Sequence, residues 1–182
     1  GNSSRTVNRK LSSLKSFYKF CMRQETISKN PMLKVVAPKI SKRLPEFVEG
    51  NKMENLFEFE FEKDFSGLRD RLILELLYGT GIRLAELVNL KTADFSGTTI
   101  KVLGKRNKER IVPVNSILAN LIQEYLAKKG EIEGSDREVL LVTDSGQKLY
   151  EKFVYRKVNH YLSYVTTAKK KSPHVLRHTF AT

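Results

Sequence analysis

The chain has 182 residues, enough for one domain with its own core together with part of another. Its 33 Lys and Arg against 20 Asp and Glu give a net charge of +13, which favours a polyanionic partner, above all nucleic acid. The single cysteine, Cys21, excludes an internal disulfide and a Cys-x-x-Cys metal site, and no apolar run reaches the roughly 20 residues of a membrane-spanning helix. We therefore expect a cytoplasmic protein without a membrane partner.

The N-terminal region predicts one amphipathic helix followed by a break. Apolar residues recur at helical spacing over residues 4–22, with Arg and Lys between them. Asn30-Pro31 ends the local structure, and residues 39–46 read as a basic, extended linker. The apolar stripe of a single helix needs packing partners that the next residues do not supply. We therefore interpret residues 1–38 as the end of a helical domain.

Residues 47–182 predict an α+β fold that is mainly helical, with one small antiparallel sheet. The expected helices cover residues 53–61, 68–77, 84–90, 118–128 and 151–165. Two β-rich runs, 98–102 and 110–114, flank a turn that suits a hairpin, and residues 139–142 read as a short strand. Gly79 and Gly81 are expected to break the helix that precedes them.

The stretch over residues 171–182 predicts a helix that begins with a cationic cluster. Ser172 is a good N-cap and Pro173 suits the first helical position. Arg177 and His178 follow His174 by three and four residues, so the three side chains share one side of the helix. A guanidinium at the positive end of a helix favours an anion such as phosphate.

The two histidines of this stretch allow two other interpretations. Histidines four apart can present two ligands to a metal, but the zinc-protease pattern needs Glu directly after the first His, and Val175 stands there. Hydrogen bonding of the histidines within the fold is an alternative that this stretch alone leaves open. We expect no metal site.

Two further stretches place cations at turns. Arg83 follows Gly81 by two residues and precedes Glu86 by three, which suits either a surface ion pair or a catalytic arginine. The tip of the predicted hairpin carries four cations, Lys105, Arg106, Lys108 and Arg110. These cations allow three interpretations: a turn exposed to solvent, a contact with the phosphate backbone of a nucleic acid, or an active site that one of the lysines reaches.

Taken in their order along the chain, the three stretches resemble the catalytic domain of tyrosine recombinases, the phage integrase family. The resemblance is strongest to the Xer and mobile-element branches of that family. Residues 81–87 match Gly-x-Arg-x-x-Glu-Leu, residues 104–108 match Gly-Lys-x-x-Lys, and residues 174–178 match His-x-Leu-Arg-His. The resemblance covers residues 40–182. It implies that residues 1–38 end the helical core-binding domain of the family and that residues 47–182 form part of the catalytic domain.

The resemblance also implies roles for individual residues. The implied catalytic residues are Arg83, Lys105, His174 and Arg177, with Glu86 and His178 in support. The implied DNA contacts are Lys42, Arg43, Arg106, Lys108 and Arg110. Guanidiniums would stabilise charge on the phosphate without a metal or another cofactor, and the lysine would protonate the leaving 5′ oxygen.

In the family a tyrosine attacks DNA to form a 3′-phosphotyrosine. That tyrosine lies beyond the His-x-Leu-Arg-His box, and no tyrosine of this sequence stands at that position. We therefore expect a monomeric fragment that binds double-stranded DNA but does not cleave it, from a recombinase that acts as a tetramer on two DNA sites. The alternatives are a DNA-binding or architectural protein without catalysis and a metal-dependent nuclease.

Overall fold

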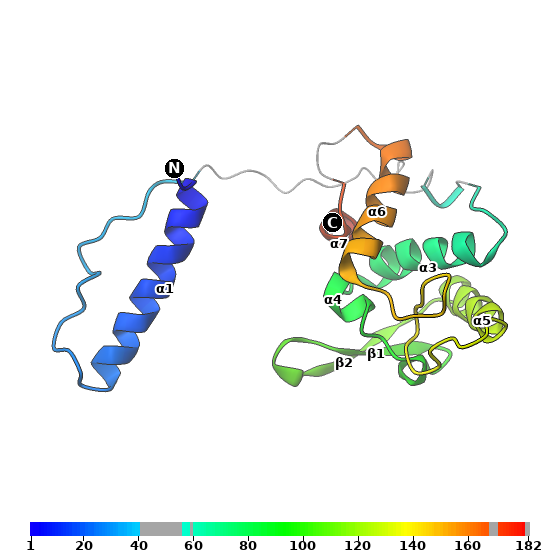
Figure 1. Ribbon diagram of the computed structural model, residues 1–182, viewed down its shortest axis with the longest axis horizontal. Coiled ribbons are helices and arrows are strands. Elements are labelled where there is room, and N and C mark those ends of the chain that lie inside the picture. Colours follow the sequence, from blue (N-terminus) through cyan, green and yellow to red (C-terminus); the bar gives the residue numbers. More distant parts are fainter. Residues whose placement is uncertain (41–55, 59, 168–170, 181–182) are drawn as a thin grey trace. The chain divides into compact units, whose positions relative to one another are not determined.

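A computed structural model describes the backbone of residues 1–40, 56–58, 60–167 and 171–180, and the side chains of these residues up to position 177. The chain divides into two compact units, Gly1–Leu44 and Pro45–Thr182 (Figure 1). The predicted linker lies almost wholly outside the described residues, as do residues 53–55 and 59 of the predicted helix over residues 53–61. Residues 56–58 are helical, whereas residues 60 and 61 are not.

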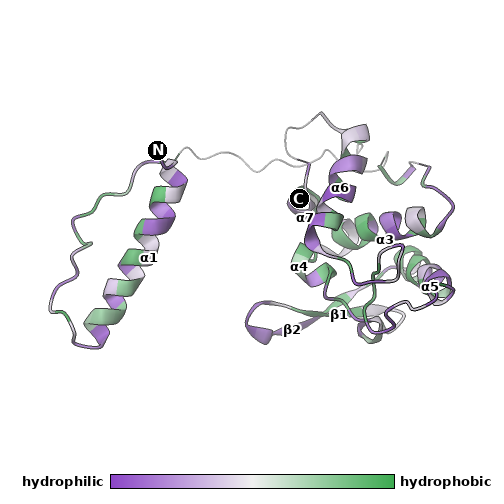
Figure 2. Ribbon diagram, viewed as in Figure 1, coloured by the Kyte–Doolittle hydropathy of each residue, from purple (hydrophilic) through white to green (hydrophobic). Residues whose placement is uncertain are grey.

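The first unit contains the predicted N-terminal helix, α1 (Ser4–Arg23). The helix begins where the Ser3 hydroxyl accepts a hydrogen bond from the Thr6 N–H, which satisfies one of the free amides of the first turn. No residue of α1 is buried, and apolar side chains such as Phe17 and Phe20 are exposed. Apolar and polar residues are interleaved along the helix (Figure 2), as the sequence pattern predicted.

The second unit is built around α3 (Phe65–Thr80), whose residues are mostly buried. This helix packs against α5 (Ser116–Gly130), α6 (Glu151–Val165) and α7 (Pro173–Phe180), as Figure 1 shows. The positions of these four helices were predicted to within a few residues. A fully buried helix needs apolar residues on every side, and the run of Leu and Ile between Leu72 and Leu77 supplies them.

The glycines at the end of α3 have different roles from those predicted. The helix continues through Gly79. A glycine inside a helix lowers its stability by only about 1 kcal/mol relative to alanine, and tertiary packing offsets that loss. The helix ends instead at Gly81, which adopts the left-handed conformation with φ 58°. Glycine adopts this conformation without the steric cost that a Cβ brings.

The predicted hairpin is present as a two-stranded antiparallel sheet. Strands β1 (Thr99–Leu103) and β2 (Glu109–Pro113) pair with Thr99 opposite Pro113 and Leu103 opposite Glu109. Ile100 and Val102 point into the core, which fixes the register. The turn is a short 3₁₀ segment, Lys105–Asn107, and the hairpin tip is strongly hydrophilic (Figure 2).

Two predictions about secondary structure were wrong. Helix α4 covers only Leu84–Leu87, not residues 84–90, because the Leu90 carbonyl leaves the helical path and accepts the Leu140 N–H at 2.8 Å. Residues 139–142 form no strand and contribute only isolated bridges. The Val142 N–H donates to the Tyr125 hydroxyl at 3.0 Å, so a side chain replaces a neighbouring strand there.

A buried charge network joins α3 to the loop after residue 142. Arg69 is fully buried, and its guanidinium pairs with Asp70 at 3.1 Å and with Asp144 at 2.8 Å. The guanidinium also lies 4.7 Å from the centre of the Phe153 ring. Lys157 pairs with the other Asp70 oxygen at 2.7 Å, so each buried charge has a partner.

Within the described residues, no helix is both long and apolar enough to cross a membrane. The same residues include no cluster of His, Cys, Asp and Glu side chains suited to a metal ion.

Candidate active site

The centre of the candidate site is Glu86, in the short helix α4. Its Oε2 accepts the Arg83 N–H at 2.8 Å, and its Oε1 accepts Nη1 of the same arginine at 2.6 Å. Arg110, on β2, donates Nη2 to Oε2 at 2.7 Å and Nη1 to Oε1 at 3.1 Å. One nearly buried carboxylate therefore orients two guanidiniums from separate elements.

The charge of Glu86 depends on these contacts. Burial by itself raises the pKa of Glu86, but hydrogen bonds from Arg110 and Arg83 outweigh it and lower the pKa from 4.5 to about 2. Hydrogen bonding to the carboxylate also raises the pKa of Arg110. The carboxylate is thus ionised throughout the physiological range.

The lowered pKa predicts how stability changes with pH. The folded chain binds fewer protons at Glu86 than the unfolded chain, so this contribution is complete above pH 4.5 and disappears as the pH falls towards 2. We expect Glu86→Gln to lose on the order of 3 kcal/mol of unfolding free energy at pH 6. Urea unfolding at pH 6 and pH 3 measures the free energy of unfolding of both proteins. The difference between Glu86→Gln and wild type should be smaller at pH 3 than at pH 6. Equal differences at both pH values would contradict the assignment.

Arg177 comes from α7 and lies beside the turn that ends α3. Its Nη1 donates to the Gly81 carbonyl oxygen at 2.6 Å, across 96 residues of sequence. Val175 and Leu176 are buried and fix which side of α7 faces the core. Since Arg83 follows Gly81 by two residues, the two predicted catalytic arginines are attached to the same turn.

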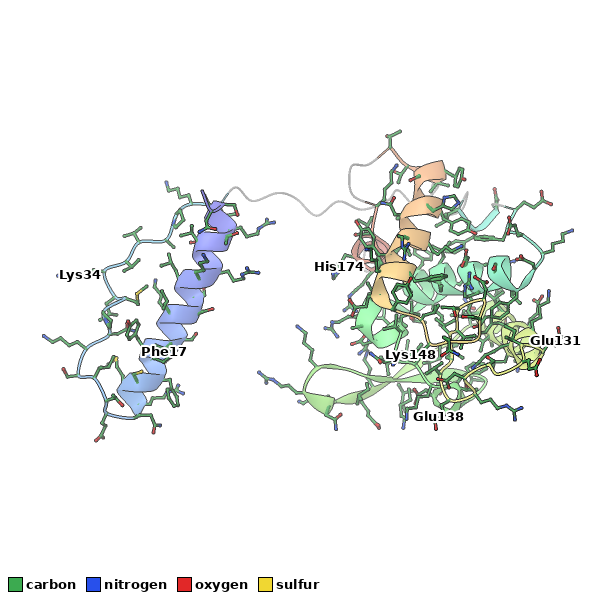
Figure 3. All side chains as sticks on the ribbon, viewed as in Figure 1. Phe17, Lys34, Glu131, Glu138, Lys148 and His174 are labelled. Carbon is green, nitrogen blue, oxygen red and sulfur yellow. The ribbon has the colours of Figure 1, made fainter. Side chains whose placement is uncertain are left out.

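The other residues predicted on this helix are only partly described. His174 is exposed on α7, one helical turn before Arg177 (Figure 3). The side chain of His178 and both linker cations, Lys42 and Arg43, lie outside the described residues. Their roles stay predictions.

A cleft of about 610 Å³ opens beside Glu86 and the hairpin. Its lining includes Arg83, Glu86 and Lys105, so the structure brings the first two predicted motifs together. Arg106 and Lys108 are exposed on the hairpin and do not line this cleft. Their predicted contacts with DNA, and that of Arg110, stay predictions.

Sequence reasoning missed several residues of the cleft, among them Lys148 and Asn89. Lys148 lies in the loop after Gly146, and its Nζ donates to Asn89 Oδ1 at 2.6 Å. Neither residue belongs to one of the three motifs, and 59 residues separate them in the sequence. A lysine after a glycine turn was the only available signal, and it is too common to be informative.

The arrangement is chemically suited to an anion. Arg83 and Arg177 are held by a carboxylate and a carbonyl, and Lys105 brings an ammonium group to the same region. Fixed guanidiniums bind a phosphate diester well, because their N–H groups match its oxygens. The fold and the cleft thus define a mainly helical domain in which cationic side chains line a cleft suited to an anion.

Residues 46–182 match the family described as the phage integrase family, and the chain belongs to this family. Among its relatives is tyrosine recombinase XerC of Staphylococcus haemolyticus, 44% identical over 179 residues, which cover 97% of this chain and 60% of the relative. XerC of Myxococcus xanthus is 38% identical over 181 residues, with 96% and 60% coverage. The chain therefore spans about 60% of the length of these relatives.

A solved structure confirms the fold. The XerH site-specific recombinase bound to palindromic difH substrate, in its post-cleavage complex, superposes with a TM-score of 0.77 at 25% identity. The match covers 100% of this chain and 54% of that one. The family resemblance carried by the three motifs and the α+β fold predicted from the apolar spacing are both confirmed.

Proposed function

We propose that the chain is part of a site-specific recombinase that breaks and rejoins double-stranded DNA through a 3′-phosphotyrosine. The observation that carries this proposal is the contact of Arg177 with the Gly81 carbonyl, because it attaches both arginine motifs to one turn. The tyrosine recombinases among the relatives, and the substrate-bound XerH structure, support the same activity.

The proposed chemistry follows from the charges. Attack on the phosphodiester gathers negative charge on the nonbridging oxygens, and the guanidiniums of Arg83 and Arg177 stabilise it. The tyrosine loses its phenolic proton to water and its oxygen bonds to phosphorus, the bond to the 5′ oxygen breaks, and Lys105 donates the proton that the leaving oxygen needs. His174 assists proton transfer, and Glu86 holds Arg83 in place. No tyrosine of this chain is assigned the nucleophilic role.

The proposal extends to the organisation of the protein. Residues 1–38 would end a core-binding domain, residues 39–46 would link it, and residues 47–182 would form part of the catalytic domain. The division of the chain between Leu44 and Pro45 supports this assignment. In the cytoplasm, the full-length recombinase would act as a tetramer on two DNA sites, whereas the chain alone would be a monomer.

DNA binding by this chain should depend steeply on salt. With about four phosphate contacts, the affinity for duplex DNA is expected to fall about 100-fold between 50 and 200 mM NaCl, because each contact releases counterions. Fluorescence anisotropy with a labelled duplex measures this. Added EDTA should not change this affinity. A metal-dependent nuclease, by contrast, would lose its cleavage activity when EDTA removes the metal. Binding that does not change with salt would contradict the proposal.

Catalysis is tested in the full-length protein on a duplex that contains its target site and a nick near the cleavage position. A covalent protein–DNA product that survives denaturant is expected, because the nick lets the cleaved end diffuse away. Salt-dependent binding without any covalent product would instead identify a DNA-binding or architectural protein.

A further inference from the structure

We propose that Lys148 binds a backbone phosphate of the DNA, in addition to the phosphate held by the two arginines. This inference rests on the proposed function, but it adds a contact that lies outside all three motifs. Lys148 lines the same cleft as Arg83 and Lys105, although it comes from a different part of the chain.

The partner of Lys148 leaves its charge free to act on a ligand. The ammonium donates to the neutral amide oxygen of Asn89 at 2.6 Å, and Asn89 in turn donates its Nδ2 to the Ala85 carbonyl at 2.7 Å. In the described part of the chain, no carboxylate forms an ion pair with Lys148. An ammonium has three N–H donors, so two remain for phosphate oxygens.

The acidic groups of the cleft are largely engaged elsewhere. Both oxygens of Glu86 accept hydrogen bonds from arginines, and Asp94 Oδ2 accepts the Lys91 N–H at 2.8 Å. Glu138 lines the cleft as an exposed carboxylate. The cations of the lining, Arg83, Lys91, Lys105 and Lys148, outnumber its three acids. An anionic polymer is thus favoured along this wall.

The backbone around Lys148 is fixed before any ligand arrives. The Thr143 N–H donates to the Gln147 carbonyl at 2.7 Å, and residue 148 forms an antiparallel bridge with Val142. Asp144, at the tip of the same turn, is bound to the buried Arg69 at 2.8 Å. The turn is therefore closed at its base and attached to the core through Asp144, so little backbone entropy is lost when Lys148 binds phosphate.

Lys148→Gln separates this role from a merely structural one. Glutamine can still donate to Asn89 and keep the loop in place, but it carries no charge. In the 182-residue chain with a labelled duplex, we expect a 5- to 10-fold weaker affinity at 100 mM NaCl, by order of magnitude. The plot of log binding constant against log salt concentration should become shallower by about 0.9, the amount for one phosphate contact.

The controls are a substitution of a second exposed lysine and a conservative substitution of Lys148 itself. Lys63→Gln removes an equally exposed lysine outside the cleft and should leave affinity and slope close to wild type. Lys148→Arg should restore both. Thermal unfolding of Lys148→Gln should match that of wild type.

The possible outcomes separate the inference from the proposed function. A Lys148→Gln chain with wild-type affinity and slope overturns the inference, while the steep salt dependence of wild type still supports DNA binding. A weaker affinity with an unchanged slope assigns Lys148 a structural role and also overturns it. If wild type binds no DNA at low salt, the proposed function itself fails.

Discussion

Arg177→Ala in the full-length protein is expected to slow formation of the covalent protein–DNA intermediate about 1,000-fold. In the proposed mechanism, the Arg177 guanidinium, which is held against the Gly81 carbonyl, stabilises charge that develops only in the transition state. DNA binding should change less than about 10-fold, because one contact among several is lost. Single-turnover cleavage of a nicked duplex and anisotropy titration measure the two effects.

Two further variants make this test specific. Arg177→Lys keeps the charge but not the planar fork of donors, so it should recover only part of the rate. Arg137→Ala removes an exposed arginine that does not line the cleft and should cleave like wild type. If Arg177→Ala lowered binding and cleavage by the same factor, its catalytic role would be refuted.

Arg69→Ala is expected to lower the unfolding free energy of the chain by about 3–5 kcal/mol. The substitution leaves Asp70, which is only 2% exposed, without its arginine partner and removes the guanidinium that lies over Phe153. Burying a charge that has lost a partner costs far more than an exposed ion pair contributes. Urea unfolding followed by circular dichroism measures the loss.

Neighbouring variants test whether the buried pair is the cause. Asp144→Ala should cost less than Arg69→Ala, because the Asp144 side chain is 64% exposed and the buried Arg69 keeps its pair with Asp70. The double variant Arg69→Leu with Asp70→Leu should be more stable than Arg69→Leu alone, since no buried charge is then left over. An Arg69→Ala chain as stable as wild type would show that the network contributes nothing.

Local patterns predicted most of the fold. The apolar spacing over residues 151–165 gave the bounds of α6, and Ser172-Pro173 marked the start of α7. The two β-rich runs predicted the hairpin because alternating residues face the core and solvent. Within the candidate site, the Arg83–Glu86 pair was predictable because residues three apart on a helix are neighbours.

Long-range contacts could not be predicted in this way. The contact of Arg110 with Glu86, 24 residues away in the sequence, was not predicted. The strand expected at residues 139–142 is replaced by a bond to Tyr125, whose position depends on the packing of α5. The pair formed by Lys148 and Asn89 likewise exists only once the chain has folded.

The left-handed turn at Gly81 has a mechanical consequence. Arg83 follows this turn by two residues along the backbone. Arg177 is attached to the same turn because its side chain donates to the Gly81 carbonyl. A displacement of this turn is therefore expected to move both arginines together. The two arginine motifs are coupled through one turn of backbone, although 96 residues separate Gly81 from Arg177.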